Sequence, residues 1–393
     1  MAKKSMVLRG LTALFTFVFA LSIVAGVILE GYKSTIDTNL GTQSEKFVSE
    51  STEADPLYNK FTPSAEVLNE DGTGNSHALI QKAMNLNRQQ AAEGAVLLKN
   101  ENNTLPLASG SKVTLLGIRS HVPLVGSSFG VKAWGGFINL EQALSQNKTD
   151  FANTITTSVN TNRQTGEVTV GRTVSSWSGD EFEFEGAGYE INPTMVSIYE
   201  KLNETYNHAN NETPAEVYDP GEPSLAEIAA VDSSYESSFA QYGDASIVVI
   251  SRPSAESKDY LPGGIAEGLG ADEPLALTTN ERDIIETAKK ASDKVIVLVN
   301  SATAVEIGDL KNDPDIDAIL WIGFPGCYGM TGIADILCGR TSPSGGLPDI
   351  YPTYNMSSPA MQNMGKMYYT NTADVITRSG GLLSFTPGAY TIE

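Results

Sequence analysis

The sequence predicts an α/β fold, in which a mostly parallel β-sheet is flanked by helices on both faces as a three-layer sandwich. Short runs of Val, Ile and Leu without polar interruption are typical of strands that are buried on both faces. Segments with helical periodicity alternate with these runs, as the crossover connections of parallel strands require. The chain has 393 residues, of which 41% are hydrophobic and 19% charged, and this composition suits a globular chain.

The predicted strands are five apolar runs of the buried type, namely residues 95–98, 113–118, 247–250, 295–299 and 318–322. The predicted helices are residues 76–92, 195–202, 280–291 and 330–337, with a shorter helical segment at 305–310. Ser76 is expected to be the N-cap of the first of these helices. Residues 76–353 therefore form the predicted sandwich domain, and residues 150–223, which begin with a stretch rich in Thr, Ser and Val, form a predicted insertion.

The N-terminal segment predicts a transmembrane helix. Residues 11–29 carry no charge, and at about 1.5 Å of rise per residue they nearly span a hydrocarbon core of about 30 Å. Lys3, Lys4 and Arg9 precede this run, so the basic end is expected to stay in the cytoplasm. We therefore predict a membrane anchor at residues 1–30. A cleaved signal peptide is the alternative, although its apolar core usually has only about 7–15 residues.

This anchor gives the expected domain order and location. A polar stalk is expected at residues 31–75, because this segment is rich in Ser, Thr, Glu and Asp and shows little periodicity. Residues 354–393 form a C-terminal extension after the sandwich domain. The chain is expected to be a single-pass protein of the cell membrane, with its C-terminal part outside the cell.

The charge and the scarce residue types exclude several functions. Lys and Arg total 26 against 47 Asp and Glu, a net charge of -21, which disfavours nucleic acid as a partner. Two cysteines cannot form a disulfide framework in a chain of this length. The three histidines lack the spacing of metal ligands, and no nucleotide-binding glycine motif occurs, so neither a metal nor a cofactor is predicted.

Two stretches carry a resemblance to a known family. The first, residues 91–107, reads A-A-E-G-A-V-L-L-K-N-E-N-N-T-L-P-L. The second begins at Val295 and ends, at residues 321–352, with W-I-G-F-P-G-C-Y-G-M-T-G-I-A-D-I-L-C-G-R-T-S-P-S-G-G-L-P-D-I-Y-P. Together they resemble the α/β sandwich domain of glycoside hydrolase family 3, the β-glucosidase and β-xylosidase family. Cys327 and Met330 depart from the residues common in that family, and Glu93 and Lys99 are expected to be structural charges.

The resemblance implies a retaining glycosidase, which needs two carboxyl groups about 5–5.5 Å apart. In the family, an aspartate of a (β/α)8 barrel is the nucleophile and a glutamate on a loop of the sandwich domain is the acid/base. Residues 251–260, S-R-P-S-A-E-S-K-D-Y, resemble that loop. The match makes Glu256 the catalytic candidate and Lys258 and Asp259 the substrate-binding candidates; Glu267 and Glu273 are second choices for the acid/base.

The barrel itself is not predicted in this sequence. No S-D-W or T-D-W occurs, and a barrel needs about 250 residues, more than the anchor and sandwich leave. We therefore expect a fragment or a split enzyme, whose barrel is encoded downstream or on another chain, and a β-linked oligosaccharide or glycoside as substrate. Without its barrel the chain is expected to be inactive. The alternative is a non-catalytic carbohydrate-binding or scaffolding protein derived from the same domain.

Overall fold

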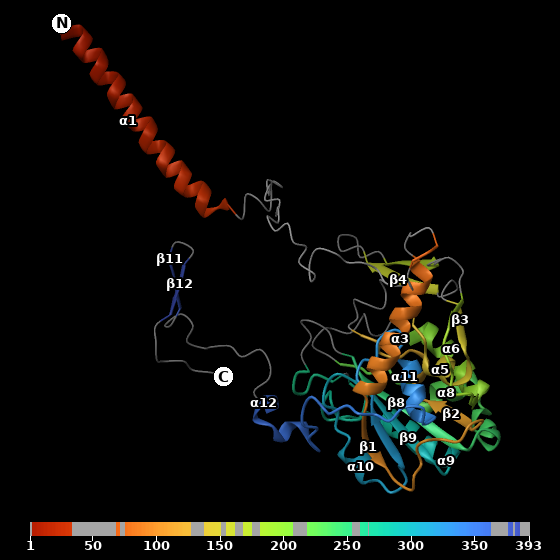
Figure 1. Ribbon diagram of the computed structural model, residues 1–393. Coiled ribbons are helices and arrows are strands. Elements are labelled where there is room, and N and C mark those ends of the chain that lie inside the picture. The colour runs from red at the N-terminus through yellow and green to blue at the C-terminus, as the bar shows by residue number, and fades with distance from the viewer. Residues whose placement is uncertain are drawn as a thin grey trace. The chain divides into compact units, whose positions relative to one another are not determined.

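The computed structural model describes residues 2–33, 68–70, 75–126, 137–150, 155–161, 168–174, 181–206, 218–253, 260–265, 267–362, 376–379 and 382–385 (Figure 1). The chain divides into two units, Met1–Pro63 and Ser64–Glu393.

The described residues of the first unit form one long helix, α1 (Ala2–Gly31). Its segment Met6–Gly31 has a mean hydropathy of 2.5 and is long and apolar enough to cross a membrane, although a signal sequence would meet the same criteria. Phe15, Phe17 and Phe19 are exposed along it, so water is an unfavourable environment for this helix. The predicted stalk falls mostly at residues 34–67 and 71–74, which lie outside the described residues.

The second unit is built on a six-stranded sheet in the order β1-β10-β9-β8-β2-β7. Its strands are β1 (Val96–Asn100), β2 (Lys112–Leu116), β7 (Glu190–Ile191), β8 (Ala245–Arg252), β9 (Val295–Ser301) and β10 (Ala318–Trp321). All neighbours are parallel except β1, which pairs antiparallel with β10. The five predicted strands are all present, and the mostly parallel arrangement is confirmed.

The antiparallel edge strand β1 was not predicted. This strand follows helix α3 (Ser76–Gly94) directly, without a crossover from another strand of the sheet, so no connection forces it to run parallel to β10. β7 was also missed: it has only two residues, and the predicted insertion contributes it to the main sheet beside β2.

Helices cover both faces of the sheet. On one face lie α3, α5 (Leu140–Ser145) and α11 (Met330–Leu337), and on the other α6 (Pro193–Tyr206), α8 (Leu225–Val231), α9 (Thr279–Ala291) and α10 (Gly308–Asn312). The remaining short helices are α4 (Ile118–His121), α12 (Pro359–Gln362) and the 3-10 turns Tyr235–Gln241 and Asn355–Ser357. Three further two-stranded pairs join β3 (Lys148–Asp150) to β6 (Glu181–Glu183), β4 (Ile155–Thr161) to β5 (Val168–Val174), and β11 (Ile376–Ser379) to β12 (Leu382–Phe385).

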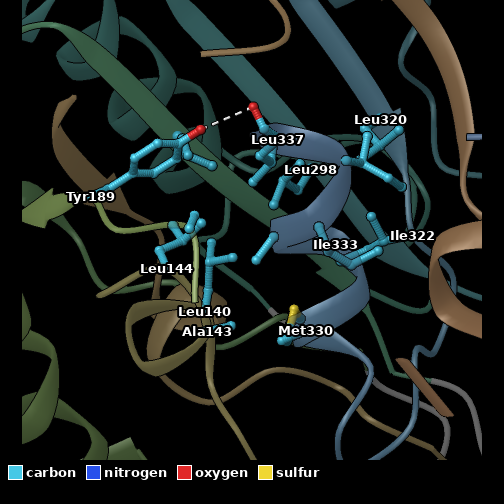
Figure 2. Close-up of a cluster of buried hydrophobic side chains, with 14 of the residues drawn as sticks. Leu140, Ala143, Leu144, Tyr189, Leu298, Leu320, Ile322, Met330, Ile333 and Leu337 are labelled. Carbon is cyan, nitrogen blue, oxygen red and sulfur yellow. Dashed lines mark hydrogen bonds between the residues drawn. The ribbon is translucent and has the colours of Figure 1, made fainter. Parts of the chain in front are cut away.

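The strand residues divide alternately between two hydrophobic cores. Ile247 and Val249 of β8 pack in the core under α3 and α11, whereas Val248 and Ile250 pack in the core under α9. This alternation is why a strand covered on both faces is apolar at every position. In the first core (Figure 2), the hydroxyl of Tyr189 donates a hydrogen bond of 3.0 Å to the carbonyl oxygen of Leu337 at the end of α11.

The caps explain where two of the helices begin. Asn75, not Ser76 as predicted, is the N-cap of α3, because its side chain accepts a hydrogen bond from the backbone N–H of Ala78 at 3.0 Å. Thr278 caps α9 in a capping box with Glu281. This box leaves Glu281 buried at the first turn of α9, beside the end of β8.

Candidate functional site

The candidate site lies at the edge of the sheet where the parallel strands β2, β8, β9 and β10 end. Ligands of open α/β sheets bind outside the carboxyl ends of the strands, since the connecting loops converge there. Gly117 follows β2 at this edge and Pro253 follows β8.

The three predicted site residues fall on the segment after β8. Glu256, Lys258 and Asp259 lie outside the described residues, so their predicted roles stay predictions. Pro253 and Tyr260, on either side of the segment 254–259, are described. Of the two second choices, Glu267 is exposed, and Glu273 accepts a hydrogen bond of 2.9 Å from the backbone N–H of Gly263.

Arg252, the last residue of β8, forms a buried ion pair with Glu281 of α9. The Nη1–Oε1 distance is 2.6 Å and the Nη2–Oε2 distance 3.0 Å, so both carboxylate oxygens accept from the guanidinium. The two side chains are 0% and 3% exposed. Such a bidentate pair fixes the orientation of both groups as well as their separation.

The remaining N–H groups of Arg252 donate to backbone carbonyl oxygens. Nε donates to Pro274 at 2.8 Å, Nη2 to Ala276 at 2.6 Å, and Nη1 to Ser251 at 2.6 Å. Together with Glu281, these acceptors satisfy all five guanidinium donors. Arg252 therefore joins the end of β8 to the segment before α9 and to α9 itself. Arg252 was not predicted as a site residue, although an arginine at the end of an apolar strand is a visible signal.

Two tyrosines, Tyr218 and Tyr260, lie near Arg252 at the end of β8. The Arg252 guanidinium carbon lies 5.6 Å from the centroid of the Tyr218 ring, and this ring lies 5.1 Å from the ring of Tyr260. The backbone N–H of Tyr218 donates to the carbonyl oxygen of Gly264 at 2.9 Å. The hydroxyl of Tyr260 donates a hydrogen bond to the carbonyl oxygen of Pro253. The two residues that flank 254–259 are thus joined directly.

A second acidic group, Glu222, is buried near the end of β2. Its Oε2 accepts a hydrogen bond of 2.9 Å from the backbone N–H of Ile118, while Oε1 is buried with no hydrogen-bond partner among the described residues. Burial raises the pKa of Glu222 to about 8, although the hydrogen bond from Ile118 opposes the shift. Glu222 is therefore mostly a neutral acid at pH 7. Glu222 was not predicted from the sequence, in which Pro220 and Pro223 on either side of it are the local signal.

Glu93, Lys99 and Cys327, which the sequence brought to notice, have contacts typical of structural residues. Lys99 is buried and its Nζ donates to the carbonyl oxygen of Asp313 at 2.6 Å, whereas Glu93 accepts from Gln89 at 2.8 Å. They do not pair with each other. Burial raises the pKa of the Cys327 thiol, which disfavours the reactive thiolate. Across the part of the chain that the structure describes, no cluster of three His, Cys, Asp or Glu side chains could hold a metal ion.

A mostly parallel sheet covered by helices on both faces is an α/β sandwich. Comparison with known families is more specific. The family model described as the glycosyl hydrolase family 3 C-terminal domain matches residues 95–390. The chain belongs to this family, as the resemblance in the sequence predicted.

Curated relatives are glycosidases. The chain is 26% identical over 307 residues to β-glucosidase A of Butyrivibrio fibrisolvens, covering 74% of this chain and 31% of that protein. It is 25% identical over 337 residues to an exo-1,4-β-xylosidase of Aspergillus niger, covering 79% of this chain and 32% of that protein. The chain thus spans about a third of the length of these relatives.

A solved structure shares the fold. The β-glucosidase of Paenibacillus barengoltzii superposes with a TM-score of 0.50 at 24% identity, covering 72% of this chain and 26% of that chain. This similarity supports the assignment of an α/β sandwich fold to the second unit.

Proposed function

We propose that this chain is the sandwich part of a membrane-anchored, retaining β-glycosidase and that Glu256 is its acid/base. The observation that carries the proposal is the buried ion pair of Arg252 with Glu281 at the end of β8. This pair fixes the end of β8, the strand that directly precedes residues 254–259 in the chain. The end of β8 lies at the carboxyl edge of the sheet, where ligands of such sheets bind. Family membership supports the same assignment, because the curated relatives include a β-glucosidase and an exo-1,4-β-xylosidase.

In the proposed reaction, the Glu256 carboxyl group protonates the glycosidic oxygen as the bond to the sugar breaks. A second carboxylate, the nucleophile, attacks the anomeric carbon and forms a glycosyl-enzyme intermediate. Glu256 then removes a proton from the water that hydrolyses this intermediate. The nucleophile would come from a (β/α)8 barrel, elsewhere in the complete protein or on another chain. Lys258 and Asp259 are proposed to contact sugar hydroxyls.

The substrate would be a β-linked oligosaccharide or glycoside outside the cell. Helix α1 supports the anchoring part of the proposal, because an exposed apolar helix of this length is stable in a bilayer. With residues 11–29 in the membrane and the basic residues before them in the cytoplasm, the sandwich domain would be extracellular. Extraction of the expressed chain tests this location: an integral anchor resists alkaline carbonate and yields to detergent, whereas a chain cleaved near residue 30 is released in soluble form.

The catalytic proposal is tested by combining the full chain with a separately expressed barrel domain from a family 3 β-glucosidase and measuring hydrolysis of aryl β-glucosides and β-xylosides. Glu256→Gln should lower kcat by about 10²- to 10⁴-fold for substrates with poor leaving groups, since these need a proton donor most. Glu200→Gln, at an exposed position of α6, is the control and should retain activity. Full turnover by Glu256→Gln would overturn the assignment. Sugar binding without any turnover by the wild-type mixture would favour the non-catalytic alternative.

A further inference from the structure

Residues 218–223 form a short segment, here termed the edge segment, that lies at the carboxyl edge of the sheet. The backbone N–H of Tyr218, its first residue, donates to the carbonyl oxygen of Gly264 at 2.9 Å. The ring of Tyr218 lies 5.6 Å from the guanidinium carbon of Arg252. The start of the edge segment is therefore attached both to the end of β8 and to the segment that precedes α9.

Two single hydrogen bonds attach the edge segment to helices. The carbonyl oxygen of Pro220 accepts from Nη2 of Arg119 on α4 at 3.1 Å. The carbonyl oxygen of Glu222 accepts from Nδ2 of Asn280 on α9 at 2.9 Å. No residue of the edge segment belongs to the six-stranded sheet, so its separation from these helices would leave the hydrogen bonds of that sheet intact.

The side chain of Glu222 makes the contact that depends on a proton. Its Oε2 accepts from the backbone N–H of Ile118 at 2.9 Å, and its Oε1 is buried without a hydrogen-bond partner among the described residues. Within that part of the chain Glu222 forms no ion pair, and the residue is only 8% exposed. A buried carboxylate with one neutral donor is unfavourable, whereas a neutral carboxyl group loses much less free energy on burial.

The charged and titratable groups around Glu222 and its neighbour Arg119 lie on α4, α6, α9 and the edge segment, and are Arg119, Tyr199, Glu281, Tyr218 and Asp219. Burial is the largest influence and raises the pKa of Glu222 to about 8. Repulsion from Glu281 adds to this shift, while the hydrogen bond from Ile118 and the charge of Arg119 oppose it. Glu222 therefore keeps its proton at neutral pH as long as the edge segment stays in place.

We propose that the edge segment is a pH-dependent latch, closed while the Glu222 carboxyl group is protonated and opened when this proton passes to solvent. In the open form, Tyr218 leaves the guanidinium of Arg252, and the buried Arg252–Glu281 pair at the carboxyl edge becomes accessible. The open form binds the proton more weakly than the closed form. The ratio of open to closed latch should therefore rise with pH from about 4.5 to about 8 and stay constant above.

Hydrogen exchange of the full chain between about pH 5.5 and 7.5 tests the latch. The informative amides are those of Ile118, which donates to Glu222, and of Tyr218, which donates to Gly264. At each pH, the observed exchange rate divided by the intrinsic rate gives the opening constant. This constant should rise about tenfold per pH unit for both amides, because opening releases one proton. Amides of β9 should have opening constants at least about tenfold smaller, since they exchange only when the sheet unfolds.

Glu222→Gln keeps a side chain of similar size and an acceptor for Ile118, but it does not titrate. Its opening constants should be independent of pH, and at about pH 7.5 they should be about 10²- to 10³-fold smaller than in the wild type. Glu141→Gln is the matched control. Burial also raises the pKa of Glu141, but this residue lies on α5, on the opposite face of the sheet from α9, so the variant should retain the wild-type slope.

Three results would overturn the latch. The first is a wild-type opening constant that does not change with pH, and the second is a tenfold rise per pH unit that persists in Glu222→Gln. The third is an equal opening constant for the edge segment and β9, which would mean that the segment opens only when the whole domain unfolds. If Glu222→Gln does not fold, the wild-type pH profile and its comparison with β9 test the latch without it.

Discussion

The side-chain amide of Asn300 is hydrogen-bonded to both backbone polar groups of Leu124, a residue 176 positions away in the chain. Oδ1 accepts from the Leu124 N–H at 2.6 Å, and Nδ2 donates to the Leu124 carbonyl oxygen at 2.8 Å. The same Nδ2 donates to the carbonyl oxygen of Gly323 at 2.7 Å. Asn300 on β9 thereby connects the segments that follow β2 and β10 at the carboxyl edge.

Asn300→Asp should destabilise the sandwich by about 2–5 kcal/mol, since the isosteric carboxylate cannot donate and would face two carbonyl oxygens in a buried site. Chemical denaturation of the chain measures the effect. Asn85→Asp, at an exposed position of α3, is the control and should change the free energy of unfolding by less than about 0.5 kcal/mol. Equal effects at the two positions would show that the amide of Asn300 has no special role.

The raised pKa of Glu222 makes stability depend on pH. Its folded-state pKa of about 8 lies above the ordinary value of 4.5, so between these values the folded state binds more protons than the unfolded state. The contribution of Glu222 to stability is therefore fully present below pH 4.5, is lost progressively as pH rises to about 8, and is constant above.

Glu222→Gln should flatten this decline, because the amide does not titrate. The free energy of unfolding, measured between pH 5 and 8.5 for both proteins, should fall less steeply in the variant. Glu267→Gln removes an exposed carboxyl and should retain the wild-type slope. A Glu222→Gln profile parallel to that of the wild type would contradict the raised pKa.

Gly332 lets α11 approach α3 closely. A Cβ atom at this position would lie 2.1 Å from the carbonyl oxygen of Arg88, a backbone atom that cannot rotate away. Gly332→Ala should therefore cost about 1–3 kcal/mol of stability by overpacking. Gly346→Ala is the control, since a Cβ there meets nothing within 4 Å. Thermal unfolding measures the stability of both variants. A Gly332→Ala protein as stable as Gly346→Ala would show that α3 and α11 can move apart without a loss of stability.

The Arg252–Glu281 pair should show strong coupling. Arg252→Met leaves a carboxylate without its cation in a buried site, and Glu281→Gln leaves the guanidinium without its charge partner. Each change should cost about 3–5 kcal/mol, and the double variant should cost less than the sum. The exposed pair Lys112–Glu190, whose atoms lie 3.6 Å apart, should show coupling below about 1 kcal/mol in the same cycle. Additive losses at Arg252 and Glu281 would mean that their contact contributes little.

Local patterns predicted five of the six strands of the main sheet and five of the seven helices that flank it; α5 and α8 were not predicted. The helix at residues 330–337 has the predicted bounds, and all five predicted strands are present, because apolar periodicity reports burial directly. The N-cap of α3 was misplaced by one residue, since Asn75 and Ser76 are both good caps and only the backbone geometry distinguishes them. The predicted roles of Glu256, Lys258 and Asp259 come from the family resemblance and stay predictions.

By itself, the sequence determined five of the six strands of the main sheet, the longer helices that flank it and the family of the chain, because these depend on residues near one another in the chain. Only the tertiary structure decided that β1 runs antiparallel, that Arg252 finds five acceptors and that Glu222 is desolvated. Each of these depends on groups that are distant in sequence, and the residues of one segment do not specify which other segment will lie against them.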